Sequence, residues 1–409
     1  MGRTVLRELA VGCLAAVGVF ASGCGVAPRA PLAPPRVLPA AASLPRLVLH
    51  AAWSMKVPNP THVTVAGDAS VAAGLADGAG SGRPVAWART ASGRPVPVAG
   101  RGVGVVFALA GGHVLTGPGV ANRPGPMRLV AADGHVLWEH AAVGPVAGAS
   151  DASGNRVAVL DTGAARLVEL RVGRHGADPL AAPAFSSLDG GTSIQFSAAG
   201  EALVQTPHRI ALLSAAGATE WLLHLGVGTP SRALVLDQGG GSATVATRGS
   251  RPALYGFRFG RGRPGPRWST PLPAGGRARL VAGPRGRVAV WGAGSTSAVT
   301  VYADRSGRQM WRDVLSATGS GAAPQARGVA FASGGALIVA ATGCDATGRA
   351  CLLALGQGGV PLGVRLLPAG ATVRLATDGR AAVVVEPGGG AQSRVVWYDL
   401  PSQSQSAGA

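Results

Sequence analysis

The sequence predicts an all-β fold assembled from repeated small sheets, and three observations support this prediction. A phrase of short apolar strands, a Gly-containing turn and a strand carrying Trp recurs at 129–138, 213–221 and 302–311. Related phrases recur at intervals of about 40 to 50 residues, which is typical of stacked sheets in repeat proteins. The 64 Gly and 30 Pro among 409 residues separate runs of Val, Leu and Ala, as expected of short strands joined by tight turns. Together these observations favour a β-propeller.

Each repeat resolves into four strands, and the outermost strand of each falls at a regular position. These positions are Trp53, Pro97, Trp138, Leu180, Trp221, Trp268, Trp311 and Leu362. Three of them lack Trp, so eight blades is the prediction and seven is the alternative. The chain finishes with only three strands, over 373–375, 381–386 and 394–400, whereas 47–55 is a lone strand of the outer type. We expect these four strands to form one blade, which closes the ring by pairing the N-terminal strand with the last blade.

Residues 1–23 are predicted to be a lipoprotein signal peptide. Arg3 and Arg7 form a short basic region, and the apolar run over 9–20 is too short to span a bilayer. The small residues before Cys24 resemble a bacterial lipobox, where cleavage leaves a diacylated Cys as the first residue. We therefore expect lipidation of Cys24 and a lipid anchor on the extracytoplasmic face of the cell membrane. The alternative is an ordinary signal peptide that is cut nearby.

The predicted domain organisation continues with three more segments. Residues 24–45 comprise the lipidated Cys and a linker rich in Pro and Ala, which extends to about 60 Å at roughly 3.1 Å per residue. The alternative for this linker is a disordered leader that is not a spacer. Residues 46–400 form the propeller, and 401–409 are expected to be a disordered tail.

Two further cysteines, Cys344 and Cys351, lie seven residues apart across a Gly-containing turn. Export would place them in an oxidising compartment, where a disulfide across a hairpin persists. No His lies near them in the sequence, and a metal site would need more ligands. We therefore expect a structural disulfide rather than a metal centre.

The stretch 303–311, Ala-Asp-Arg-Ser-Gly-Arg-Gln-Met-Trp, resembles the repeat of the PQQ-like, quinoprotein-type eight-bladed propellers. In that family a Gly turn precedes an outer-strand Trp that docks on the neighbouring blade. The likeness covers most of 46–400 and implies a fold rather than an activity. Enzymes of the family hold a quinone over Ca²⁺, but the adjacent cysteines that cap the quinone are absent here. No Asp-x-Asp-x-Asp-Gly loop offers ligands to calcium either. We therefore expect no cofactor and no metal.

Other catalytic patterns are also missing from the sequence. There is no Gly-x-Ser-x-Gly elbow for an acyl nucleophile, and the eight His are scattered over several blades. Asp133, Asp304 and Asp378 sit in or beside Gly-containing turns, where Asp commonly stabilises the turn. We therefore expect a protein that is not an enzyme. The alternative, an enzyme acting on an envelope polysaccharide or a small alcohol, would need carboxylates or a metal brought together from several blades.

The net charge of +18, with 36 Arg and one Lys, is the one feature beyond the fold that suggests a ligand. No Asp or Glu occurs over 238–303, where ten Arg occur. Arg261 and Arg263 fall in the third-to-fourth turn of the fifth blade, and Arg285 falls in the first-to-second turn of the sixth. Both kinds of turn lie at the same end of an antiparallel blade, so we expect these three to form an anion-binding rim. The alternative is a solvated rim that binds no ligand, on a protein that is rich in Arg throughout.

The predicted function is that of a non-enzymatic, membrane-anchored extracytoplasmic platform. Its expected partners are an envelope protein or an anionic envelope polymer, besides the membrane that holds the anchor. Nucleic acid is not expected, because it is in another compartment.

Overall fold

The computed structural model describes most of the chain between Pro34 and Leu400, and the folded unit begins at Pro34. The described ranges are 34–58, 60, 62–66, 71–74, 86–89, 96–98, 105–118, 124–144, 146–151, 153–161, 163–164, 166–173, 175–180, 193–197, 200–206, 209–214, 219–224, 231–236, 242–247, 251–258, 266–316, 323–376, 379–388 and 392–400. The predicted signal peptide, Cys24 and the predicted tail lie outside these residues.

The described residues form eight separate sheets, seven of four strands and one of five. We number them as blades one to eight. Blade one has β3 (His62–Val65), β4 (Val71–Gly74), β5 (Ala86–Arg89) and β6 (Val96–Val98), and blade two has β7 (Val105–Ala108), β8 (Val114–Gly117), β9 (Gly125–Val130) and β10 (Val136–Ala142). Blade three has β11 (Val146–Ser150), β12 (Arg156–Asp161), β13 (Arg166–Gly173) and β14 (Gly176–Leu180), and blade four has β15 (Ser193–Phe196), β16 (Ala202–Gln205), β17 (Arg209–Leu213) and β18 (Thr219–His224). Blade five has β19 (Ser231–Leu236), β20 (Ser242–Thr247), β21 (Ala253–Arg258) and β22 (Pro266–Pro271), and blade six has β23 (Gly276–Gly283), β24 (Arg287–Ala293), β25 (Ala298–Ala303) and β26 (Gln309–Val314). Blade seven has β27 (Gln325–Phe331), β28 (Leu337–Thr342), β29 (Cys351–Leu355) and β30 (Pro361–Leu366), and blade eight has β31 (Thr372–Leu375), β32 (Ala381–Pro387), β33 (Gln392–Asp399) and β2 (His50–Pro58). The short strand β1 (Arg36–Val37) joins blade six, and two 3₁₀ turns, η1 (Ala41–Ser43) and η2 (Ala110–Gly112), complete the described elements.

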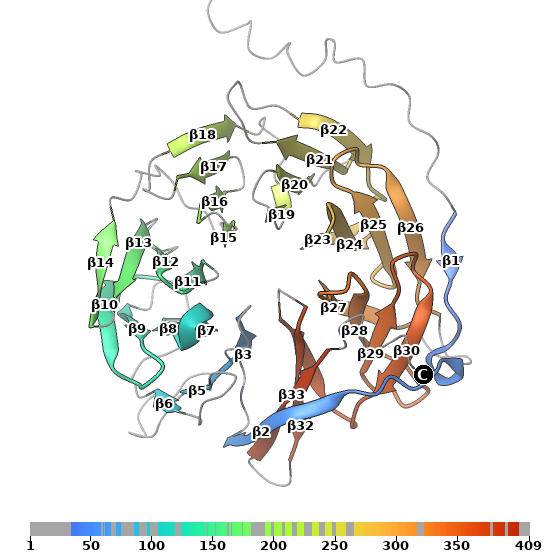
Figure 1. Cartoon of the computed structure of the whole chain (residues 1–409), viewed down its shortest axis with the longest axis horizontal. Helices are drawn as coiled ribbons and strands as arrows, with labels where there is room; N and C mark the ends of the chain where they lie inside the picture. Colours follow the sequence, from blue (N-terminus) through green and yellow to red (C-terminus); the bar gives the residue numbers. More distant parts are fainter. Residues whose placement is uncertain are drawn as a thin grey trace, which may run out of the picture. The chain divides into compact units, whose positions relative to one another are not determined.

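The eight sheets form a closed ring. The first strand of each blade contacts the first strand of the next, in the order β3, β7, β11, β15, β19, β23, β27 and β31, and β31 contacts β3 again (Figure 1). The structure thus confirms a β-propeller of eight blades, and the seven-bladed alternative is excluded. No single sheet closes on itself among the described residues, because each blade is a separate antiparallel sheet apart from the added strand β1.

The ring closes as the sequence predicts. Strand β2 pairs antiparallel with β33 in the last blade, with His50 opposite Asp399 and Lys56 opposite Arg394. Trp53 stacks on Trp397 across this pair, with ring centroids 5.7 Å apart. The N-terminal strand therefore supplies the outermost strand of a blade whose other three strands end the chain.

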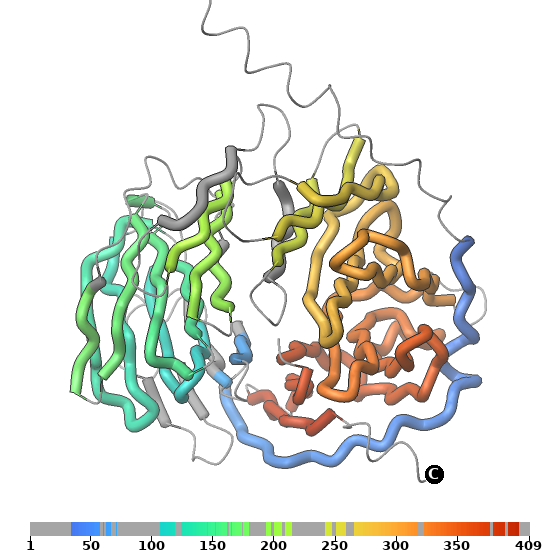
Figure 2. The backbone as a smooth tube through the Cα atoms, turned by 45° about the horizontal axis from the view of Figure 1, so that its top comes forward, coloured from blue at the N-terminus to red at the C-terminus, as the bar shows by residue number. Residues whose placement is uncertain are grey.

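A segment that precedes β2 also packs on the ring. Strand β1 pairs in parallel with β26 of blade six, and Arg46 bridges Val364 of blade seven. With β2, residues 36–58 therefore run along the outer edges of three consecutive blades, as the blue tube in Figure 2 shows. We call residues 36–49 the strap. Residues 34–45 belong to the range expected to be a linker, but their backbone is held by the edge strands that the outer face of blades six and seven offers.

The second strands of several blades are buried over nearly their whole length. β12, β24 and β28 read Arg-Val-Ala-Val-Leu-Asp, Arg-Val-Ala-Val-Trp-Gly-Ala and Leu-Ile-Val-Ala-Ala-Thr, with almost every residue buried. Such strands are apolar without alternation, because a neighbouring blade packs on each face of the sheet. The core consequently lies between the blades, as in the apolar cluster that joins blades six and seven.

Two outer-strand Trp residues, Trp268 and Trp311, dock on the next blade, as the resemblance implies. The indole Nε1 of Trp268 in blade five donates to the carbonyl of Asp304 in blade six, and Trp311 Nε1 donates to the carbonyl of Gln357 in blade seven at 2.9 Å. Gly307 has φ +62°, and a Cβ there would collide with the ring of Trp268. The Gly of the repeat is therefore required both by the backbone conformation and by the close approach of the indole.

A second device joins neighbouring blades near the axis. The guanidinium of Arg287 in blade six lies 5.7 Å from the ring centroid of Phe331 and donates to the carbonyl of Gly335 in blade seven. Arg156 in blade three repeats this arrangement with Phe196 in blade four. Burial, and next the positive charge of Arg285, lowers the pKa of Arg287. These two arginines are structural and are distinct from the exposed ones described below.

Candidate functional site

Exposed arginines gather on the innermost strands of three consecutive blades. Arg277 and Arg279 lie on β23, Arg327 lies on β27 and Arg374 lies on β31, and all four are exposed. We call these four residues the axial arginines. None of the eight innermost strands contains Asp or Glu within its described bounds. Within these described strands, the wall around the ring axis is therefore cationic on one side and contains no carboxylate.

Hydrogen bonds to neutral oxygens hold three of these side chains. Arg279 Nη1 donates to the carbonyl of Arg327 at 3.2 Å, across the boundary between blades six and seven. Arg327 Nε donates to Thr342 Oγ1 at 3.2 Å, and Arg374 Nη1 donates to the neighbouring carbonyl of Val373 at 3.1 Å. Among the described residues, no axial arginine forms an ion pair. Guanidinium forks arranged in this way suit carboxylate and phosphate groups.

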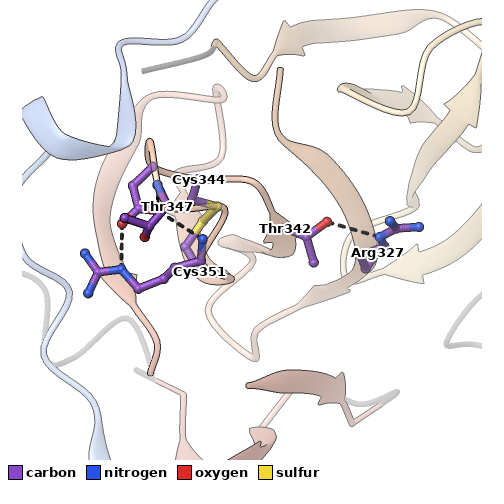
Figure 3. Close-up of a disulfide and its surroundings, with 7 residues drawn as sticks. Arg327, Thr342, Cys344, Thr347 and Cys351 are labelled. Carbon is purple, nitrogen blue, oxygen red and sulfur yellow. Dashed lines mark hydrogen bonds and ion pairs between the residues drawn. A yellow bond between two sulfur atoms is a disulfide. The ribbon is translucent and has the colours of Figure 1, made fainter. Parts of the chain in front are cut away.

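The disulfide lies two residues after Thr342, the residue that holds the axial arginine Arg327. Cys344 and Cys351 are joined, with Cα atoms 6.0 Å apart, and close the loop between β28 and β29 (Figure 3). Thr342, which accepts a hydrogen bond from Arg327, is the last residue of β28 and lies two residues before Cys344. Both half-cystines are buried, at 1% and 3% exposure. The bridge thus stiffens the part of blade seven that positions Arg327.

The disulfide loop also holds a carboxylate in its charged form. Asp345 accepts hydrogen bonds from the backbone and side chain of Thr347 and from those of Arg349. Burial alone would raise the pKa of Asp345, but the bonds from Arg349 and Thr347 prevail and lower this pKa to about 2. Arg349 is consequently neutralised within its own loop and adds no free cation to the axial arginines.

The rim that the sequence predicts is described only in part. Arg261 and Arg263 fall between β21 and β22, outside the described residues, whereas Arg285 is exposed in the turn between β23 and β24. The backbone N–H of Asp304 donates to the carbonyl of Gly286 at 2.9 Å, which ties the first-to-second turn of blade six to its third-to-fourth turn. The two kinds of turn therefore lie at one end of this blade, which is the geometry assumed for the rim.

Two further exposed arginines lie on that rim, and the sequence did not predict their role there. Arg305 and Arg308 occupy the third-to-fourth turn of blade six, next to the turn of Arg285. Asp304, the acid of this turn, is buried at 6% exposure, and Ser242 Oγ donates to it at 3.3 Å. Both arginines belong to the repeat phrase at 303–311, which by itself predicts the fold and not a site. Their position in the third-to-fourth turn, which lies at the same end of the blade as the turn of Arg285, is the sequence signal that could have placed them on the rim.

Arg285 adopts an unusual backbone conformation. It is the only residue other than Gly with positive φ, at 61°, in the part of the chain that the structure describes. A non-Gly residue in this region costs about 1–2 kcal/mol. Strain of this kind is retained where the surrounding structure or a function requires it. The side chain of Arg285 is exposed, so packing does not explain why this position is not Gly.

Metal chemistry and membrane-spanning helices have no support in the described residues. No group of three or more His, Cys, Asp or Glu side chains there is arranged to hold a metal ion. The described part of the chain also has no helix of the length and apolar character needed to cross a bilayer.

Comparisons with known proteins identify a fold and no family. No family model and no curated protein matches the chain. Among solved structures, Sqt1 of Chaetomium thermophilum, bound to the N-terminus of ribosomal protein L10, is similar with a TM-score of 0.58 and 12% identity over 83% of this chain and 96% of that chain. The C-terminal WD40 domain of Sif2 gives a TM-score of 0.57 and 13% identity over 87% and 99% of the two chains. BamB of Moraxella catarrhalis gives 0.49 and 14% over 86% and 100%. At these identities the similarities to Sqt1 and Sif2 show the β-propeller fold alone.

Proposed function

We propose that this propeller is a lipid-anchored extracytoplasmic platform that binds an acidic segment of a protein partner at the axial arginines. The observation that carries the proposal is the cationic wall formed by β23, β27 and β31, on innermost strands that lack carboxylates. An acidic peptide offers carboxylates that several guanidiniums can bind together. Aligned cations also attract an acidic partner from a distance and orient it during association.

The proposed role is not enzymatic. An enzyme acting on polysaccharide needs a pair of carboxylates around the reacting bond. Around the ring axis the described innermost strands present arginines instead. The solved Sqt1 propeller, described as bound to the N-terminus of ribosomal protein L10, is an example of a similar fold that accepts one end of a protein chain. This example supports a peptide ligand without indicating which one.

Anchoring rests on Cys24, which the sequence predicts to be diacylated. The folded unit begins at Pro34, which lies only ten residues after the predicted anchor at Cys24. Ten residues span at most about 35 Å, which shortens the reach of about 60 Å expected for the whole range 24–45. The proposal therefore places the propeller close to the membrane surface.

Cross-linking in intact cells tests the partner proposal. The tagged protein is compared with an axial variant, Arg279→Gln/Arg327→Gln/Arg374→Gln, and with a matched rim variant, Arg285→Gln/Arg305→Gln/Arg308→Gln, that loses the same charge. We expect one cross-linked protein to be recovered with the native chain and the rim variant and to be lost with the axial variant. Equal recovery from all three, or recovery of an anionic polymer and no protein, would refute the peptide-binding proposal.

A further inference from the structure

Exposed apolar side chains accompany the arginines at the end of the ring where Arg285 lies. Met310 is the second residue of β26 and is 43% exposed. Val360 lies in the turn between β29 and β30, and Leu362 is the second residue of β30, with exposures of 59% and 45%. These strands begin at the third-to-fourth turns of blades six and seven. The apolar side chains therefore lie toward the same end as Arg305 and Arg308.

Hydrogen bonds join these two blades at this end. Trp311, the residue after Met310, donates to the carbonyl of Gln357 in the turn that contains Val360. Arg36 of the strap contacts both blades, with Nε donating to Asp313 of β26 at 2.9 Å and Nη2 donating to the carbonyl of Gly358 at 2.7 Å. Cationic and apolar side chains thus lie at the same end of two neighbouring, hydrogen-bonded blades.

The folded unit begins on this side. β1 runs parallel to β26, with Arg36 opposite Asp313 and Val37 opposite Val314. Following the chain backward from Arg36 therefore leads toward the beginning of β26, which is the end that carries the rim turn. Cys24 lies ten residues before Pro34, so the chain between them reaches at most about 35 Å from this end.

We propose that this end of blades six and seven is the membrane-docking surface of the anchored protein and that it binds anionic lipid headgroups. Its residues are Arg285, Arg305, Arg308, Met310, Val360 and Leu362, which we call the rim surface. Each Arg near an anionic bilayer strengthens binding about fivefold, and exposed apolar side chains insert at the level of the headgroups. The proposal rests on the anchoring at Cys24 proposed above.

Docking through the rim surface would also orient the partner site. The innermost strands begin at the opposite end of the ring from the first-to-second turns, and Arg277, Arg279 and Arg327 lie near the beginnings of β23 and β27. With the rim surface on the bilayer, the axial arginines open away from the membrane. The two cationic regions therefore serve different ligands, a lipid surface and a soluble acidic segment.

Depth-dependent quenching on the native lipoprotein tests this orientation. The lipidated chain is purified from membranes and reconstituted into vesicles of phosphatidylcholine with phosphatidylglycerol that contain a nitroxide-labelled lipid. A fluorophore is attached at Ser306→Cys in the rim turn or at Thr296→Cys, which is exposed in the second-to-third turn of the same blade. We expect strong quenching at 306 and little at 296, and we expect salt to weaken it because screening reduces surface attraction.

Charge variants then tie the quenching to the rim surface. In the rim variant the docking equilibrium constant, obtained from the quenched fraction at 306, should fall on the order of a hundredfold. The axial variant and a rim variant made with Lys, which keeps the charge, should both retain docking. Equal quenching at 306 and 296, or quenching that persists in phosphatidylcholine alone, would overturn the proposal. Mass spectrometry of the Cys24 peptide shows separately whether the protein carries the proposed lipid anchor. The vesicles contain no protein partner, so this experiment does not depend on the proposed binding of an acidic segment.

Discussion

Replacing Arg36 by Gln should destabilise the protein, because it leaves a buried carboxylate without its cation. Asp313 is 1% exposed, and Arg36 Nη2 lies 2.8 Å from its Oδ1. The other oxygen, Oδ2, is buried without a hydrogen-bond partner among the described residues. Breaking a fully buried pair from one side costs about 3–5 kcal/mol. Since the Arg36 side chain is 50% exposed and partly screened by water, we expect about 2 kcal/mol.

The pH dependence of this loss follows from the pKa of Asp313. Burial raises this pKa above its ordinary value of 3.8, although the hydrogen bond and charge of Arg36 oppose the increase. A carboxyl with a raised pKa binds its proton more tightly in the folded state, so stability falls as pH rises from about 3.8 through the folded pKa. Removing Arg36 raises the folded pKa further. The loss should therefore be complete at neutral pH and smaller below about pH 4.

Urea unfolding at neutral and acidic pH measures the effect. Arg128→Gln is the matched control, because Arg128 pairs with Glu139 at 2.9 Å on the surface and its loss should cost about 0.5 kcal/mol. The double variant Arg36→Gln/Asp313→Asn removes the orphaned charge and should recover most of the stability. A cost for Arg36→Gln no larger than the control, or a double variant no more stable than the single one, would refute the reasoning.

Three further predictions concern the blade contacts, the loop staple and the strained turn. Trp268→Phe should cost about 1–2 kcal/mol in thermal or urea unfolding, because the carbonyl of Asp304 loses its donor and a cavity replaces the indole; an unchanged midpoint would contradict the docking role. Cys344→Ser/Cys351→Ser should cost about 2.5 kcal/mol, as expected for a short closed loop, and reductant should then have no further effect. Arg285→Gly should raise stability by about 0.5–1 kcal/mol by relieving positive φ, while vesicle docking weakens about fivefold; a loss of stability would show that the turn is not strained.

Most of the fold could be predicted because its signals are local and repeated. The Gly of the phrase at 303–311 permits the turn, and the Trp that follows fills the gap to the next blade, so one short phrase specifies both a hairpin and an interface. Three strands at the C-terminus without a fourth implied that an N-terminal strand completes the blade. The pairing of β2 with β33 confirms that inference.

The strap could not be predicted in the same way. Residues 34–45 read as a linker, since Pro and Ala carry no periodic apolar pattern. Their order arises from partners far away in the chain, including the carbonyls of Val314 and Val364 and the buried carboxylate of Asp313. Edge-strand pairing depends on which backbone groups a finished sheet leaves open, and this is a property of the tertiary structure.

By itself, the sequence determined the all-β class and the cysteine pair that the structure shows bridged, because both depend on residues close together in the chain. It also determined the eight repeats and the closure of the ring, because these follow from the regular spacing of the repeats and from the three strands left at the C-terminus. Only the tertiary structure decided which of the many arginines act together. Arg279, Arg327 and Arg374 are about 50 residues apart in the chain, and they become neighbours because successive blades present equivalent strands to one axis. The ring thus gathers scattered charges into a surface that no linear pattern displays.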